Sequence, residues 1–393
     1  MRVEQVHPQR VAFAHVLRGF AAALVVFVHL KEAAARWMRD TLPVAPSTPR
    51  PAVELDDFSF NESIRLFNEG KVGVALFFLI SGFVIPFALC NQSRVSFSLG
   101  RFFRLWPTYA AGFSISVFAI SILAMSADQP FAYSASEIAV HYLLIFRDLI
   151  SYPNIDWIVW TLEVEVRFYL LCTLIAPLLR SANSAGLLLV GASVAGLSFL
   201  SDLAQSGWGM SGLRGLETSG AAIVFMLIGV AYNFAFRGGI GWPTAAALIG
   251  TFFAMFAVLQ SANTSGISTL FNYSIALLLF ASAFRLRSHF SDRGPLGWMG
   301  SISYSLYVVH PVFGAAILTL FLDAGLPMPV ALVSALAVVL ASAWLLHRGV
   351  ERPTHELGRR LSKRVDRLRA HNPGDAVTAQ LAGRLNMARR GAW

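Results

Sequence analysis

The apolar residues of this chain lie in long, nearly continuous runs that are separated by short polar stretches. A helix that spans a membrane needs about 20 mostly apolar residues. On that criterion the pattern predicts about ten spanning helices, at approximately 11–30, 70–90, 105–126, 160–180, 184–202, 217–236, 242–261, 266–286, 301–322 and 328–348. The stretch 137–150 is apolar but shorter, which predicts an interfacial or re-entrant helix.

The composition agrees with this pattern. The chain is 56% hydrophobic and only 13% charged, whereas soluble domains carry about 25% charged residues. We therefore expect an all-α, polytopic integral membrane protein. The first run is long enough to span and no small-residue cleavage site follows it, so we interpret it as a span and not as a signal peptide. Cys90 and Cys172 lie in or beside apolar runs, which predicts neither a disulfide framework nor a metal site.

The positive charge is unevenly distributed along the chain. With a cytoplasmic N-terminus, 21 of the 31 Lys and Arg residues fall on the cytoplasmic side and 8 on the opposite side. The positive-inside rule therefore predicts that both termini are cytoplasmic. A transmembrane domain at 1–350 would precede a basic cytoplasmic tail at 351–393. Such a tail faces the anionic surface of the lipid bilayer, so the net charge of +9 gives no reason to expect nucleic acid as a partner.

The first predicted span carries two polar residues on one face. Arg18 and His29 are eleven residues apart, which is three helical turns plus about 20°, and a separation of about 16 Å along the axis. A snorkelling Arg and a satisfied interfacial His are the simpler interpretation. Arg18 is too deep for easy snorkelling, however, so we favour a functional role for this face.

Three charges open the fourth predicted span, at Glu163, Glu165 and Arg167. Each such charge costs about 2.5 to 3.5 kcal/mol at the centre of a spanning helix and less near its ends. Glu163 and Arg167 are four residues apart, which predicts an ion pair on one flank of the helix. Glu165 is then left to meet His29, because both residues fall at the same predicted depth. A carboxylate beside a His can fix its tautomer. The alternative is that all three charges lie among lipid headgroups.

Two further groups stand out. The sequence SISYSLYVVHP places Ser303, Tyr307 and His310 on one stripe of the ninth span, and Pro311 should bend that helix and free the carbonyl of Tyr307. A mid-membrane His is more often a buried hydrogen-bonded residue than a catalyst. On the cytoplasmic side, Arg101 and Arg104 share one helix face and could bind phosphates. Positive-inside anchoring explains this pair equally well.

Several stretches, in order along nearly the whole chain, resemble the motifs of the acyltransferase-3 family of integral membrane acyltransferases. They are LRGFAAALVVFVH with Arg18 and His29, GKVGVALFFLISGFVI, RFFRLWP with Arg101 and Arg104, WTLEVEVRFYLL, SYSLYVVHP and VERP. In WTLEVEVRFYLL, Thr161 stands for the family's Ser, and the family glutamate corresponds to Glu165. Each motif alone is weak, but their succession in this order is specific.

The resemblance implies transfer of an acyl group, usually acetyl, from acyl-coenzyme A to a hydroxyl of a carbohydrate or lipid-linked glycan, without a metal. It implies a multi-pass protein of the bacterial inner membrane. His29 would be the general base, with Glu165 assisting it. Arg101, Arg104 and Arg18 would hold the donor. Tyr304, Tyr307 and His310 would line the path of its pantetheine arm.

Other interpretations remain open from the sequence. His29 could instead form a covalent acyl-enzyme. The acceptor could be a cytoplasmic small molecule such as a macrolide. Intramembrane His, Glu and Arg residues also build the proton relays of transporters, although the chain lacks the internal repeat that many transporters show.

Overall fold

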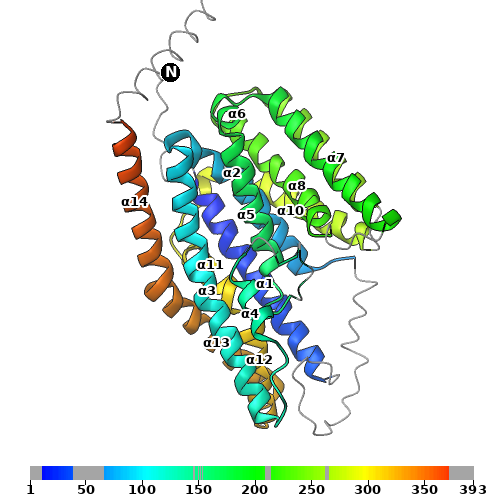
Figure 1. Ribbon diagram of the computed structural model, residues 1–393, viewed down its shortest axis with the longest axis vertical. Helices are drawn as coiled ribbons and strands as arrows, with labels where there is room; N and C mark the ends of the chain where they lie inside the picture. Colours follow the sequence, from blue (N-terminus) through cyan, green and yellow to red (C-terminus); the bar gives the residue numbers. More distant parts are fainter. Residues whose placement is uncertain are drawn as a thin grey trace, which may run out of the picture.

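The computed structural model describes residues 11–38, 66–144, 147–148, 150, 152, 154–208, 214–261 and 265–370. Their regular structure is entirely helical (Figure 1). The all-α, polytopic fold predicted from the sequence is therefore confirmed. The predictions for residues 1–10 and for the end of the tail, 371–393, lie outside the described residues.

The described residues form the following helices. In chain order they are α1 (Ala12–Met38), α2 (Glu69–Asn91), α3 (Arg94–Ser126), α4 (Ala135–His141), α5 (Val159–Leu174), α6 (Ala176–Ser181), α7 (Ser184–Trp208), α8 (Arg214–Phe236), α9 (Trp242–Ser261), α10 (Gly266–Arg285), η3 (Arg287–His289), α11 (Pro295–Val309), α12 (Val312–Asp323), α13 (Met328–Leu346), η4 (His347–Glu351) and α14 (Arg352–Ala370).

The number of spanning helices is lower than predicted. Eight helical segments of the described residues are long and apolar enough to cross a membrane, and a ninth span results if the bent pair α11 and α12 is counted as one. The predicted span at 160–180 is the difference, because it divides at Ile175 into α5 and the short α6. Pro177 lacks the N–H that a continuous helix would need there. Among the described residues of the stretch 137–150, the helical ones belong to the short helix α4, in agreement with a segment that does not span.

Helix α1 lies in the interior and packs against α2 and α11 (Figure 1). Glycine permits the close approach to α11: a Cβ on Gly19 would lie 2.0 Å from the carbonyl oxygen of Leu296, and one on Gly300 would lie 2.4 Å from that of His15. Small residues at such crossings let backbones meet where water supplies no driving force between helices. This close packing places α1 beside α11, so that His29 of α1 can meet His310 at the end of α11.

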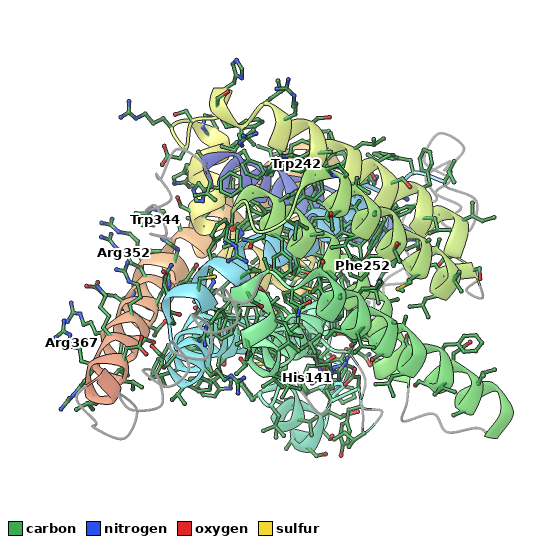
Figure 2. All side chains as sticks on the ribbon, turned by 90° about the horizontal axis from the view of Figure 1, so that it is seen from above. His141, Trp242, Phe252, Trp344, Arg352 and Arg367 are labelled. Carbon is green, nitrogen blue, oxygen red and sulfur yellow. The ribbon has the colours of Figure 1, made fainter. Side chains whose placement is uncertain are left out.

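The C-terminal part of the chain folds back onto the bundle. Helix α13 continues through the π-helical turn η4 into α14, which packs along α3 at one edge of the molecule (Figures 1 and 2). Ser96 and Ser362 join the two helices through reciprocal hydrogen bonds, each hydroxyl donating to the other residue's carbonyl at 2.8 Å. The part of the predicted tail up to Ala370 is thus a helix attached to the transmembrane domain.

Candidate active site

Two histidines from distant parts of the chain meet in the bundle. Nε2 of His310 lies 3.2 Å from Nδ1 of His29, and the two rings are 4.9 Å apart at 75°. His29 comes from α1, whereas the fully buried His310 occupies the break between α11 and α12, where the chain bends by 74°. The bend predicted at Pro311 is therefore confirmed.

The bend also supplies a partner for His310. Pro311 has no N–H to donate to the carbonyl of Tyr307. Nδ1 of His310 takes that place, 2.9 Å from the Tyr307 carbonyl oxygen and 3.1 Å from that of Leu306. Because carbonyl oxygens only accept, Nδ1 of His310 carries a proton, and Nε2 of the neutral ring is an acceptor.

The same reasoning assigns the tautomer of His29. Its Nδ1 lies 2.8 Å from the carbonyl oxygen of Val25, which again requires a proton on Nδ1. That N–H is shared with the acceptor Nε2 of His310. Nε2 of the neutral His29 ring therefore carries a lone pair, and it forms no hydrogen bond with any described residue. A histidine nitrogen in this state can accept a proton.

A pocket with both apolar and polar walls lies between α1, α2, α3, α5 and α11. Its polar lining includes Arg18, Ser81, Arg104, Glu165, Tyr304 and Tyr307. Arg101, one turn before Arg104, lies over the rings of Phe97 and Tyr169, with its guanidinium carbon 5.2 and 5.5 Å from their centroids.

The pocket has more positive than negative charge. Within the described part of the chain, Arg18, Arg101 and Arg104 form no ion pair. Glu165 is the carboxylate that lines the pocket, and it interacts electrostatically with Arg18 and Arg101. Because an unpaired charge inside a protein is strongly unfavourable, three convergent guanidinium groups favour a pocket that receives an anion.

Tyr307 connects the pocket with the histidine pair. Its hydroxyl lies 2.7 Å from Oγ1 of Thr161, which itself donates to the carbonyl of Ile158 at 2.8 Å, so Tyr307 is the donor in this bond. Its ring is 5.6 Å from that of His310, centroid to centroid. Tyr304, one turn earlier, donates to the carbonyl of Leu105 at 2.8 Å. Both tyrosines are therefore held in fixed orientations along the pocket wall.

Comparison with known protein families identifies the fold. The sequence model of an acyltransferase domain, that of acyltransferase-3, matches residues 11–348, which is most of the chain. The chain belongs to the acyltransferase-3 family. No significant match was found among curated proteins or among solved structures.

In this acyltransferase, Glu165 does not meet His29. Glu165 accepts hydrogen bonds from the hydroxyls of Tyr169 and Ser81, the latter at 3.4 Å. Within the described residues, Glu165 and His29 share no hydrogen bond. The prediction of a His29–Glu165 contact is wrong because equal depth in the membrane does not fix the direction of a side chain. Glu165 turns toward the arginines, and His310 takes the place beside His29.

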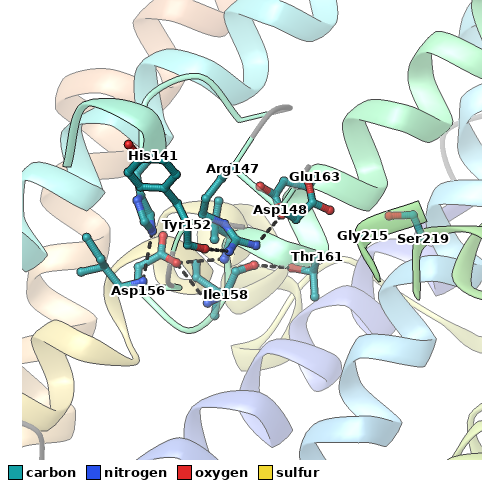
Figure 3. Close-up of polar contacts among 12 residues, drawn as sticks. His141, Arg147, Asp148, Tyr152, Asp156, Ile158, Thr161, Glu163, Gly215 and Ser219 are labelled. Atoms are coloured by element: carbon teal, nitrogen blue, oxygen red, sulfur yellow. Dashed lines mark hydrogen bonds and ion pairs between the residues drawn. The ribbon is translucent and has the colours of Figure 1, made fainter. Parts of the chain in front are cut away.

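The predicted ion pair between Glu163 and Arg167 is also wrong. Glu163 pairs with Arg147 at 2.7 Å (Figure 3). Arg167 pairs with Asp148 and donates hydrogen bonds to the hydroxyl of Ser219 and the carbonyl of Gly215. The segment between α4 and α5 folds back onto α5 and supplies Arg147 and Asp148, the ion-pair partners of Glu163 and Arg167. Spacing along one helix predicts only pairs within that helix, so these longer-range partners were not foreseen.

Asp156 holds the same segment at the start of α5. Its Oδ1 accepts hydrogen bonds from the backbone N–H groups of Ile158 (Figure 3) and Val159. Its Oδ2 accepts a hydrogen bond from the hydroxyl of Tyr109, with 2.9 Å between the oxygens. The carboxylate thus satisfies backbone donors at the helix start, as capping residues do. This contact fixes α5 relative to α3 and therefore helps to place Glu165.

The sequence reasoning assigned no role to a further buried carboxylate. Glu351, in the VERP motif, accepts hydrogen bonds from the hydroxyl of Ser305 at 2.7 Å and from Nδ1 of His347 at 2.9 Å. It ties η4 to α11 next to the tyrosines of the pocket. Its place in the VERP stretch was the visible signal. No group of His, Cys, Asp and Glu side chains in the described ranges has the arrangement of a metal site.

Proposed function

We propose that this acyltransferase moves an acyl group, in the simplest case acetyl, from acyl-coenzyme A on the cytoplasmic side to a hydroxyl of a carbohydrate or lipid-linked glycan on the outer side. The host membrane would be the bacterial inner membrane. One observation carries the proposal: Tyr307 lines a cationic pocket, and its ring lies 5.6 Å from that of His310, which is hydrogen-bonded to His29, a histidine with a free lone pair. An anionic donor and a proton acceptor are what such a transfer needs.

The donor would enter with its phosphates at Arg101 and Arg104. Guanidinium groups bind phosphates through paired, charge-assisted hydrogen bonds. The thin pantetheine arm would then pass Arg18 and Tyr307, and the thioester would arrive near the histidine pair. Glu165 would act here as a positioning residue, because its contacts with Tyr169 and Ser81 place a negative charge among the arginines.

His29 would be the general base. As the acceptor oxygen attacks the thioester carbonyl carbon, its proton passes to Nε2 of His29. Collapse of the tetrahedral intermediate breaks the C–S bond, and the sulfur of coenzyme A takes the proton back from His29. The products are an ester and free coenzyme A, and His29 returns to its starting tautomer. His310 would be a positioning residue that holds the proton on Nδ1 of His29.

Transfer assays with membranes would test the proposal. Labelled acetyl-coenzyme A is the donor, and label is followed into the polysaccharide fraction. His29→Ala should lower transfer by about 10²- to 10⁴-fold, the usual contribution of a general base, while coenzyme A binding is retained. His289→Ala, at an exposed histidine of η3, is the matched control. Full transfer by His29→Ala at equal expression would contradict the mechanism.

The covalent alternative makes a different prediction in the same assay. A nucleophilic His29 would give ping-pong kinetics and an acyl-enzyme in the absence of acceptor. Label that remains on the quenched wild-type protein, but not on His29→Ala, would replace the general-base mechanism with the covalent one. Label that accumulates only in a small soluble product would instead indicate a cytoplasmic acceptor.

A further inference from the structure

Helix α14 packs against α3 in a defined antiparallel register. Ser96 lies opposite Ser362 through their reciprocal hydrogen bonds. One turn further along α3, a Cβ on Gly100 would lie 3.2 Å from Oγ of Ser362. A Cβ on Gly358 would lie 2.6 Å from Cβ of Phe103. As the residue number rises on α3, it falls on α14.

This register brings His355 to Arg104. Arg104 directly follows Phe103 on α3, and His355 lies about one turn from Gly358 toward the start of α14. His355 interacts electrostatically with Arg104, Arg359 and Arg101, in that order of strength, and with Glu351. Positive or protonatable groups from two helices therefore gather at one place.

The cluster has few negative groups of its own. Glu351 is occupied by Ser305 and His347. Within the described residues, Arg359 has no ion pair, whereas its neighbour Arg360 pairs with Glu356 at 2.8 Å. Positive charges that lie close together repel one another. A site where several cationic side chains converge is therefore suited to bind an anion.

We infer that α14 completes the donor site and that His355 and Arg359 bind the coenzyme A phosphates together with Arg101 and Arg104. This inference rests on the proposed function. Helix α14 lies beyond the residues that match the family, so the family relationship assigns no role to it. The coenzyme carries a pyrophosphate and a ribose 3′-phosphate, which need more cationic partners than the two arginines of α3 provide.

The test measures coenzyme A binding by calorimetry to the full chain in nanodiscs of phosphatidylcholine. Arg359→Ala and His355→Gln should each weaken binding by about three- to tenfold, the range expected when one partly exposed ionic contact with a phosphate is lost. The matched control, Arg360→Ala, should bind within about twofold of the wild type. Titration with dephospho-coenzyme A, which lacks the ribose 3′-phosphate, shows which phosphate each residue contacts. A variant that has lost the residue in contact with the 3′-phosphate should bind coenzyme A and dephospho-coenzyme A with equal affinity.

The outcomes separate this inference from the proposed function. If the wild type binds coenzyme A, Arg101→Ala does not, and both α14 variants bind like the wild type, the inference is wrong and the donor site stands. If the wild type itself fails to bind, the proposed donor is wrong and the inference falls with it.

An anionic lipid headgroup is the other source of phosphate near this helix. The same titrations in nanodiscs that contain phosphatidylglycerol distinguish it. If the variants weaken coenzyme A binding only in that lipid, or lose lipid association without any change toward coenzyme A, the residues contact headgroups and the inference is overturned. Equal losses in both lipids support it. Size-exclusion profiles that match the wild type show that the variants are folded.

Discussion

Nδ1–H of His29 donates a hydrogen bond to Nε2 of His310, with 3.2 Å between the two nitrogens. Two residues that are far apart in the sequence thus form one hydrogen-bonded chain, which begins at the carbonyl of Tyr307 and ends at the free Nε2 of His29. Each link fixes the tautomer of the next. Catalysis by His29 should therefore depend on every member of this chain.

Replacement of His310 tests the first link. His310→Ala should lower the turnover number while the KM for the donor stays close to that of the wild type, because the pocket arginines are untouched. His310→Gln should recover part of the loss, since its amide oxygen can accept from Nδ1 of His29. Steady-state transfer kinetics of both variants provide the measurement. Equal losses in Ala and Gln would indicate a role other than acceptance of this hydrogen bond.

Pro311→Ala tests how the bend orients His310. The new N–H can donate to the carbonyl of Tyr307, which now accepts from His310. We expect the helix to straighten, His310 to lose this partner, and the turnover number to fall. Pro243→Ala, at an exposed proline in the first turn of α9, is the matched control. Wild-type activity of Pro311→Ala would show that the bend does not depend on the missing donor.

The ion pair of Arg147 with Glu163 should matter for stability more than for chemistry. Both side chains are almost fully buried, at 8% and 0% exposure. Glu163→Gln leaves Arg147 without its charge partner, and loss of one member of a buried pair costs about 3 to 5 kcal/mol. A lower thermal unfolding temperature in detergent is the expected result.

Two further variants test whether the loss of stability comes from the broken ion pair. Asp292→Asn removes an exposed carboxylate just before α11 and should shift the unfolding temperature less. The double replacement Arg147→Met with Glu163→Leu removes both charges and should recover much of the stability, because paired buried charges can be exchanged for apolar residues of similar volume. A double variant as unstable as Glu163→Gln would contradict the ion-pair explanation.

Gly19 tests whether the crossing of α1 with α11 sets the histidine pair. A Cβ there would lie 2.0 Å from the carbonyl oxygen of Leu296, so Gly19→Ala should force the helices apart and reduce transfer. Gly196→Ala in α7 is the matched control, since a Cβ at Gly196 has nothing within 4 Å. Comparable transfer by the two variants at equal expression would show that the active site tolerates a wider crossing.

Much of the fold could be predicted from the long, nearly continuous apolar runs. Spans emerge from the sequence because a bilayer imposes the same length on every helix that crosses it. The division of the span at 160–180 was missed because apolarity conceals a break near Pro177. The bend at Pro311 was foreseen, since a proline removes a local donor whatever surrounds it.

The site residues were visible in the sequence, but their partners were not. Sequence alone marked His29, His310, Glu165 and the arginines, because charged and polar residues inside apolar runs are costly and therefore conspicuous. Only the tertiary structure decided that His29 meets His310, that Glu165 turns to the arginine pocket, and that Arg147 neutralises Glu163. The physical reason is that helix spacing determines which residues share a face, whereas helix crossing and loop return determine what that face meets.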